Sequence, residues 1–292
     1  MTPDQYCQDK AANSGSSFYY SFLFLPESQR QAIMALYAFC REVDDIVDSH
    51  FEAHIKQAKL NWWRQEIKAL FQDTAQHPVT RALQPAIARY NLPQEQFEEI
   101  ITGMEMDLHN LRYSSFKELS LYCYRVASVV GLLSAEIFGY QDRKTQKFAH
   151  DLGMALQLTN ILRDIAEDAR RNRIYLPQDE LRQFNVEEAD LLQGKASKNF
   201  VALMQFQLQR AQGYYDKAMA ELPDKDRYTQ RASLVMANIY QNILNKIAAE
   251  DFRVLDQRIK LSVLRKLWLV WNTLRQEKRR YKKWLRLNPL PG

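Results

Sequence analysis

The stretch Tyr37-Ala-Phe-Cys-Arg-Glu-Val-Asp-Asp-Ile-Val-Asp48 carries the pattern that decides the fold. A second stretch, Gln157-Leu-Thr-Asn-Ile-Leu-Arg-Asp-Ile-Ala-Glu-Asp168, repeats the same pattern. In both, apolar residues recur at steps of three and four, which predicts amphipathic helices. Each stretch also places two aspartates four residues apart, and such a pair lies on one helix face about 5–6 Å apart.

The rest of the 292-residue chain is also typical of helices. It has only 8 glycines and 9 prolines, which favours long helices over many short strands. Helical periodicity predicts further helices over 50–73, 116–138, 142–170, 185–192, 196–221, 227–249 and 261–285, with two more after Pro78 and Pro93. Because no repeat or linker interrupts the pattern, we expect a single all-α domain spanning 1–292.

The net charge of +5 is unevenly distributed. Residues 251–292 carry twelve Lys/Arg and three Asp/Glu, a net charge of +9, so the preceding residues sum to −4. The predicted helix at 261–285 combines these charges with leucines and tryptophans, a composition that suits contact with an anionic membrane surface. A packed final helix with a solvated basic end is the alternative.

Cysteine usage and the apolar runs bear on the cellular compartment. Cys7, Cys40 and Cys123 are far apart and lack metal-type spacing, which indicates reduced thiols in a cytoplasmic protein. The N-terminus lacks the layout of a signal peptide. No run of about 18 apolar residues occurs, so we expect no helix that spans a bilayer.

The two acidic rows indicate a chemistry. The polar face of the first stretch holds Tyr37, Arg41, Asp44 and Asp48, that of the second holds Gln157, Asn160, Asp164 and Asp168, and neither stretch contains lysine. Mg²⁺ takes carboxylate and phosphate oxygens, and it makes a bound diphosphate a better leaving group. Nearby arginines would add bidentate phosphate contacts. A single acidic pair is more often a solvated surface, but two such pairs within apolar stretches favour magnesium-bridged diphosphate binding.

Other metal centres fit the sequence less well. Di-iron carboxylate bundles use Glu-x-x-His pairs, and none of the five histidines makes such a pair. A zinc site requires a cluster of histidines and cysteines, which is also missing from the sequence.

At these residues the sequence resembles the squalene/phytoene synthase family over nearly its whole length. The matching segments are Ser14-Gly-Ser-Ser-Phe-Tyr-Tyr20, Tyr37–Asp48, Tyr122-Cys-Tyr-Arg-Val-Ala-Ser-Val-Val-Gly131, Gln157–Asp168 and Arg173-Ile-Tyr-Leu-Pro-Gln-Asp179. The resemblance implies the all-α isoprenoid synthase fold, a helical bundle around a central cavity. Asn172 is a departure, because the family more often has glycine at this point of the loop.

The resemblance also implies roles for individual residues. The magnesium ligands would be Asp44, Asp48, Asn160, Asp164 and Asp168, and the four aspartates together with Tyr122 would be catalytic. Tyr122 matches a tyrosine thought to assist proton removal in the family. The two diphosphates would be held by Ser14, Ser16, Ser17, Tyr37, Arg41, Gln157, Asn160, Arg163, Arg173, Tyr240 and Arg258. Candidate cavity walls are Phe18, Phe22, Val126, Val129, Val130, Leu133 and Leu158, although plain core packing explains most such residues better.

Within the family, the run from Tyr6 to Pro26 is most similar to bacterial enzymes that make presqualene diphosphate for hydroxysqualene and hopanoid synthesis. The implied reaction is a Mg²⁺-dependent head-to-head condensation of two farnesyl diphosphates with release of diphosphate. Several Mg²⁺ ions would bind per site, and NADPH is not expected for this first half-reaction. A cytoplasmic enzyme, peripheral at the inner face of the membrane and passing its product to downstream enzymes of the pathway, would fit this reading.

Other outcomes stay open from the sequence. The same fold could yield squalene, dehydrosqualene, hydroxysqualene or phytoene. A non-catalytic helical binding protein, its basic tail engaging nucleic acid, is a more remote alternative. We expect no nucleic-acid partner, because the acidic rows would repel phosphates without a metal ion.

Overall fold

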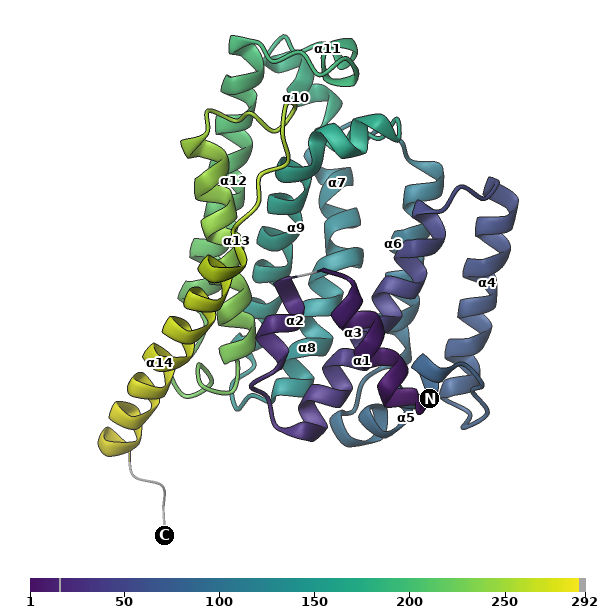
Figure 1. The fold of residues 1–292 in the computed structure, drawn as a ribbon, viewed down its shortest axis with the longest axis vertical. Coiled ribbons are helices and arrows are strands. Elements are labelled where there is room, and N and C mark those ends of the chain that lie inside the picture. Colours follow the sequence, from purple (N-terminus) through teal and green to yellow (C-terminus); the bar gives the residue numbers. More distant parts are fainter. Residues whose placement is uncertain (16, 289–292) are drawn as a thin grey trace.

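The computed structural model describes residues 1–15 and 17–288, and in this part of the chain the all-α prediction is confirmed (Figure 1). No β-strand forms among these residues, and one isolated β-bridge joins Arg112 and Ile174. The helices are α1 Pro3–Asn13, α2 Ser17–Phe22, α3 Glu27–Asp48, α4 Ala53–Leu70, α5 Pro78–Tyr90, α6 Gln94–His109, α7 Phe116–Cys123, the π-helical η1 Tyr124–Ser128, α8 Val129–Phe138, α9 Lys144–Arg170, α10 Gln178–Gln183, α11 Glu188–Leu192, α12 Lys198–Glu221, α13 Arg231–Ala249 and α14 Val263–Leu287.

Two adjoining groups of helices build the core. In the first, α9 packs against α12, α13, η1 and α8. In the second, α3 packs against α1, α5 and α6. Phe18, Val126 and Met236 contact the apolar residues of both groups, so the two hydrophobic clusters meet between α3 and α9.

Helix ends follow local signals in the sequence. The Thr2 hydroxyl accepts a hydrogen bond from the Gln5 backbone N–H, and the Gln5 side chain returns one to the Thr2 N–H, which forms a capping box before α1. Helix α5 is followed by Asn91 at φ 51° and α8 by Gly139 at φ 81°. Asparagine and glycine tolerate positive φ, so both residues stop a helix at low cost.

The helix predicted over 116–138 is present but contains the π-helical segment η1. The backbone of α9 lies very close to the backbone of η1 and of the start of α8. A Cβ added to Gly153 would lie 2.6 Å from the Ser128 Cα, and one added to Gly131 would lie 2.5 Å from the Ala149 carbonyl oxygen. Only glycine permits this approach, and π-bulges within α-helices are frequent at functional sites.

The same helix bears on the expectation that no helix spans a bilayer. Phe116–Phe138 is long and apolar enough to cross one, by length and composition alone, so that expectation stays a prediction. Its segments pack against α6 and α9 inside the bundle.

Two local features differ from the sequence-based expectations, and a third accounts for the unusual residue at position 172. Helix α1 was not predicted, because it buries only Cys7 and Ala11 and so shows little apolar periodicity. The helix expected over 185–192 forms only at Glu188–Leu192, since Asn185 adopts φ 51°. Asn172 has φ 57°, a left-handed conformation that asparagine tolerates and that glycine adopts most readily.

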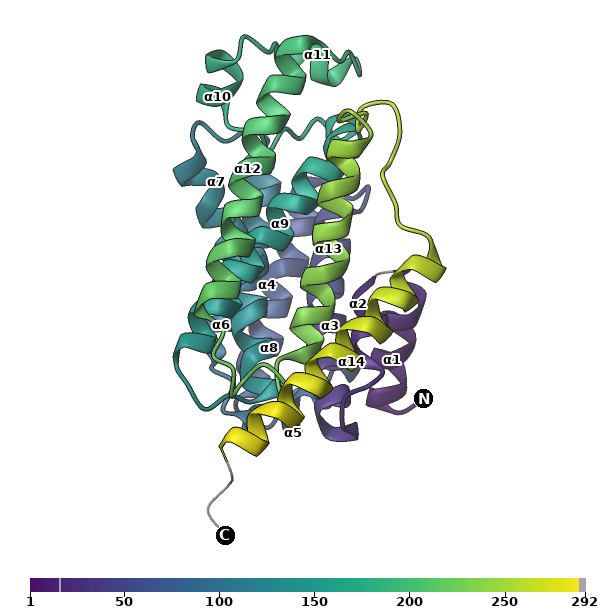
Figure 2. The ribbon, with the colours of Figure 1, turned by 90° about the vertical axis from the view of Figure 1, so that its left-hand side faces the viewer.

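The last helix lies diagonally across the bundle, where it packs against α13 and α2 (Figure 2). It buries one face, formed by Leu269, Val270, Thr273 and Glu277. The rest of its surface carries most of the basic residues of the C-terminal segment.

Candidate active site

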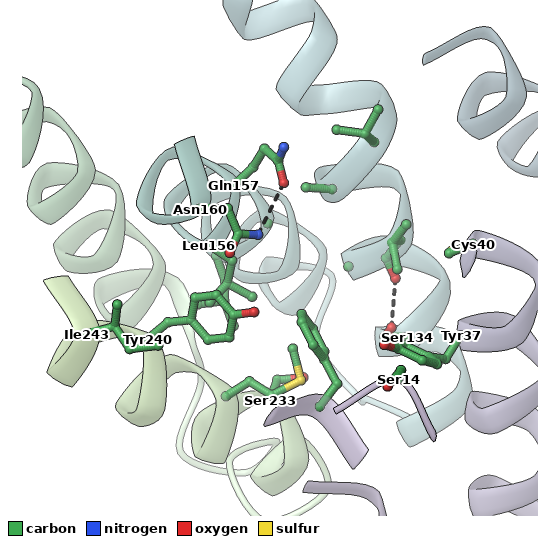
Figure 3. Close-up of a pocket in the computed structure, with 18 of the residues that line it drawn as sticks. Ser14, Tyr37, Cys40, Ser134, Leu156, Gln157, Asn160, Ser233, Tyr240 and Ile243 are labelled. Atoms are coloured by element: carbon green, nitrogen blue, oxygen red, sulfur yellow. Dashed lines mark hydrogen bonds between the residues drawn. The ribbon is translucent and has the colours of Figure 1, made fainter. Parts of the chain in front are cut away.

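A cavity of about 620 Å³ lies between α3 and α9. Its walls come from α2, α3, η1, α8, α9 and α13, from residues 258–261, and from Lys266 at the start of α14. In Figure 3, Gln157 and Asn160 on α9 lie across the cavity from Tyr37 and Cys40 on α3. Eight of the predicted site residues line it: Ser14, Tyr37, Arg41, Gln157, Asn160, Arg163, Tyr240 and Arg258.

Most of the cavity wall is apolar. Phe18, Phe22, Val126 and Val130 contribute to it as expected. The other three predicted wall residues, Val129, Leu133 and Leu158, do not line the cavity and are buried in the core instead. The cavity also includes Lys260 and Lys266, two basic residues that the sequence analysis did not single out.

The acidic row of α3 continues along the helix from the cavity lining. The Arg41 guanidinium lies in the lining and donates to Asp44 at 2.6 Å and to Asp45 at 2.7 Å. Asp44 and Asp48 follow one and two turns farther along α3, outside the cavity lining. Burial and the nearby carboxylates of Asp48 and Asp107 raise the pKa of Asp44 to about 6, although Arg41 opposes the shift.

The acidic row of α9 has the same arrangement. Arg163 lines the cavity and donates to both carboxylate oxygens of Asp164. Arg258 reaches Asp164 at 3.2 Å and Glu167 at 3.1 Å from the segment before α14. Burial, followed by repulsion from Asp164, raises the pKa of Asp168 to about 8. The site therefore crowds carboxyl groups together beside the arginines.

Asp48 links the two acidic helices through the loop after α9. Its carboxylate accepts hydrogen bonds from Arg171 at 2.7 Å and from Arg173 at 2.9 Å. Arg173 is buried and also donates to the Val47 carbonyl, so it does not line the cavity. The end of α3 and the end of α9 are thus held together by ion pairs.

The residues of the two rows fit a hard divalent cation. They offer carboxylate and amide oxygens, the donors that Mg²⁺ prefers, and the Asn160 Oδ1 atom is buried without a hydrogen-bond partner. Asp44, Asp48 and Asp164 each pair with an arginine. In residues 1–15 and 17–288 no three acidic, histidine or cysteine side chains lie close enough to hold one ion, so the ligand set stays a prediction.

Tyr122 lies outside the cavity lining, in a buried polar network. Its hydroxyl donates to Asp107 Oδ2 at 2.9 Å, and the Tyr175 hydroxyl donates to Asp107 Oδ1 at 2.8 Å. Asp107 is only 5% exposed, and burial raises its pKa to about 6 despite the opposing charge of Arg173. The catalytic role of Tyr122 stays a prediction, and its immediate partner is this carboxylate.

The sequence analysis missed Asp107, although a signal was present. The apolar stripe of α6 runs through Ile100, Ile101 and Met104, and Asp107 takes the next position on that face. A charged residue on a buried helix face requires partners, so it is a candidate for a functional network.

The three serines predicted to bind diphosphate and the three cysteines differ in their positions relative to the cavity. Ser14 lines the cavity, and Ser17 begins α2. Ser16 lies outside the described residues. All three cysteines are free, as expected; Cys7 and Cys123 are buried, and Cys40 lines the cavity.

The squalene/phytoene synthase family model matches residues 11–265. The chain belongs to this family. It is 39% identical over 276 residues to a 15-cis-phytoene synthase from Synechococcus elongatus, with 89% of both chains covered. As a member of the squalene/phytoene synthase family, it is an enzyme of the prenyltransferase type.

Solved structures of related enzymes agree with this family. A dehydrosqualene synthase in complex with ligand superposes with a TM-score of 0.85 at 28% identity, covering 95% of this chain and 97% of the other. A squalene synthase from Alicyclobacillus acidocaldarius superposes with a TM-score of 0.77 at 28% identity, covering 86% and 94%. The all-α isoprenoid synthase fold is therefore shared with enzymes whose described products differ.

Proposed function

We propose that this protein condenses two farnesyl diphosphates head to head to presqualene diphosphate, with Mg²⁺ bound at the acidic rows. One observation carries the proposal. A largely apolar cavity of about 620 Å³ ends beside two helices whose polar rows pair arginines with carboxylates. Such a site matches a molecule with a long apolar tail and a diphosphate head.

The arginines have the chemistry to bind the diphosphate groups. Arg41, Arg163 and Arg258 reach the cavity from three different segments, and a guanidinium binds phosphate oxygens in a bidentate manner. Magnesium, when bound, would neutralise the diphosphate and stabilise it as a leaving group. The Asn160 Oδ1 atom has no hydrogen-bond partner and is available to such an ion.

The apolar walls suit a cationic intermediate. When the C1–O bond of one substrate breaks, the diphosphate takes the electron pair and an allylic cation remains. The double bond of the second substrate supplies the electrons for the new carbon–carbon bond, and loss of a proton closes the cyclopropane ring. Walls such as Phe22, Leu36 and Leu152 keep water away from this cation.

Phytoene formation is a second candidate, and the names of the relatives favour it. The Synechococcus relative is a phytoene synthase, as is a chloroplastic relative from Solanum lycopersicum at 36% identity. The two candidates begin with the same bond-forming step and differ in the chain length of the substrate and in the fate of the cyclopropane.

Mass spectrometry of the products separates these candidates. The purified chain is incubated with Mg²⁺ and either farnesyl or geranylgeranyl diphosphate, with and without NADPH. We expect presqualene diphosphate from farnesyl diphosphate, with NADPH making no difference. Phytoene from the longer substrate would favour the second candidate, and no coupled product from either substrate would contradict both.

A further inference from the structure

We propose that one face of α14 docks this protein on an anionic lipid bilayer, beside the wall of the cavity. This α14 face consists of Leu264, Leu267, Trp268, Trp271, Arg275, Lys278, Arg279, Lys282 and Arg286, all of which are exposed. Their spacing follows steps of three, one, three and four, so they share one side of the helix.

The α14 face is not needed to hold the helix on the protein. The buried residues Leu269, Val270, Thr273 and Glu277 lie on the opposite side of the helix, against α13 and α2. By contrast, Leu264 is 80% exposed, Trp268 47% and Trp271 54%. Large apolar side chains that repeat on an exposed face indicate a surface that another apolar phase covers.

The α14 face changes character along its length. Its first four members are apolar and its last five are basic. The one acidic residue of the helix, Glu277, is buried on the other side and pairs with Arg227 at 2.9 Å and with Arg280 at 3.2 Å. Because the α14 face therefore carries no negative charge, it is complementary to anionic headgroups above an acyl layer.

Two arginines lie over the exposed indole rings. The Arg265 guanidinium is 4.7 Å from the Trp268 ring centroid, and that of Arg275 is 5.0 Å from the Trp271 centroid. Tryptophan and arginine both present an apolar body with a polar end, a combination that suits the boundary between headgroups and acyl chains. This arrangement favours a lipid surface over a purely apolar protein partner.

The α14 face begins next to the cavity. Residues 258–261 and Lys266 belong to the cavity wall, and Leu264 and Leu267 lie on either side of Lys266 in sequence. A bilayer seated on the α14 face would therefore lie close to the cavity, so an apolar molecule would have a short path between the two. The docking itself does not depend on which product the enzyme makes.

Vesicle flotation with the full chain tests this inference. Vesicles of phosphatidylcholine alone are compared with vesicles containing phosphatidylglycerol. We expect the unaltered chain to bind only the anionic vesicles. The affinity for these vesicles should fall about tenfold or more in the double variant Trp268→Ala/Trp271→Ala. It should fall about fivefold for each basic charge that is neutralised, for example by Lys278→Gln. Trp62→Ala is the matched control, because Trp62 is 47% exposed on α4, on the other side of the molecule (Figure 1).

The outcomes decide the matter in either direction. Circular dichroism verifies that the variants fold, and Leu264→Asn provides a second change at the most exposed position. Loss of binding in the α14 variants but not in Trp62→Ala supports the inference. Failure of the unaltered chain to bind anionic vesicles, or unchanged binding by the tryptophan and leucine variants, would overturn it. The inference would also be overturned if the unaltered chain were a dimer and the tryptophan variant a monomer that still binds vesicles. The α14 face would then contact a second copy of the chain.

Discussion

Asp107 provides a sharp test of the electrostatics around the site. Its buried carboxylate accepts hydrogen bonds from Tyr122 and Tyr175, and its pKa is raised from an ordinary 3.8 to about 6, chiefly by burial. Such a rise means that ionising this carboxyl group costs about 3 kcal/mol more in the folded than in the unfolded chain. Asp107→Asn keeps the shape of the side chain and removes its titration.

The sign of the effect follows from proton linkage. Below pH 3.8 the carboxyl group is protonated in both the folded and the unfolded chain, so it adds no pH dependence. Between about pH 4 and pH 6 the unfolded chain loses this proton while the folded chain keeps it. The unaltered protein should therefore lose about 3 kcal/mol of stability relative to Asp107→Asn as the pH rises through this range.

Urea unfolding of both proteins at several pH values, with EDTA present, measures this difference. The Asp107 charge also contributes to the raised pKa of Asp44 and of Asp168, so the substitution lowers those two pKa values and enlarges the stability difference in the same direction. Glu66→Gln is a matched control: Glu66 is buried too, but hydrogen bonds from the His77 N–H and the Thr80 hydroxyl outweigh its burial and lower its pKa. Its contribution to stability should disappear as the pH falls, the opposite trend. A stability difference between the unaltered protein and Asp107→Asn that stays constant with pH would refute the reasoning.

Four further substitutions have clear expected outcomes. Gly153→Ala brings a methyl group to 2.6 Å from the Ser128 Cα and should lower the free energy of unfolding by about 1–3 kcal/mol. At Gly213 an added methyl group meets no atom within 4 Å, so Gly213→Ala should raise the free energy of unfolding by up to about 1 kcal/mol. Urea unfolding of the two variants measures both changes. Tyr122→Phe should lower kcat about a hundredfold with little change in KM if its hydroxyl assists proton removal, and an unchanged kcat would remove that role. Arg163→Lys keeps the charge but loses the planar fork, so KM for the prenyl diphosphate should rise about tenfold in steady-state assays; an equal KM would argue against a diphosphate contact.

The helices were predictable because local sequence patterns specify them. Apolar periodicity, prolines at starts and asparagine or glycine at ends act over one or two turns. The segments of α3 and α9 were therefore placed correctly, and Arg41, Gln157, Asn160 and Arg163 all reach the cavity lining. Helix α1 escaped notice because its stability comes from packing against α3 and α5, a long-range effect.

What depends on side chains from distant segments was harder to foresee. Asp48 pairs with Arg171 and Arg173, more than 120 residues away, and this pairing keeps Arg173 out of the cavity. The Tyr122–Asp107 contact likewise joins two helices whose relative rotation the sequence does not fix. The π-helical segment η1 arises where glycines of α8 and α9 allow the backbones to meet, which is a property of the pair of helices.

The Mg²⁺ dependence of diphosphate release tests the central claim most directly. Release from farnesyl diphosphate is followed in EDTA and in rising Mg²⁺, for the unaltered chain, Asp44→Asn and Asp164→Asn. The control is Asp216→Asn, because Asp216 is an exposed residue of α12. The account predicts release only with Mg²⁺, its near-complete loss in the first two variants, and normal release in the control. Equal release in EDTA, or normal turnover by Asp44→Asn and Asp164→Asn, would contradict it.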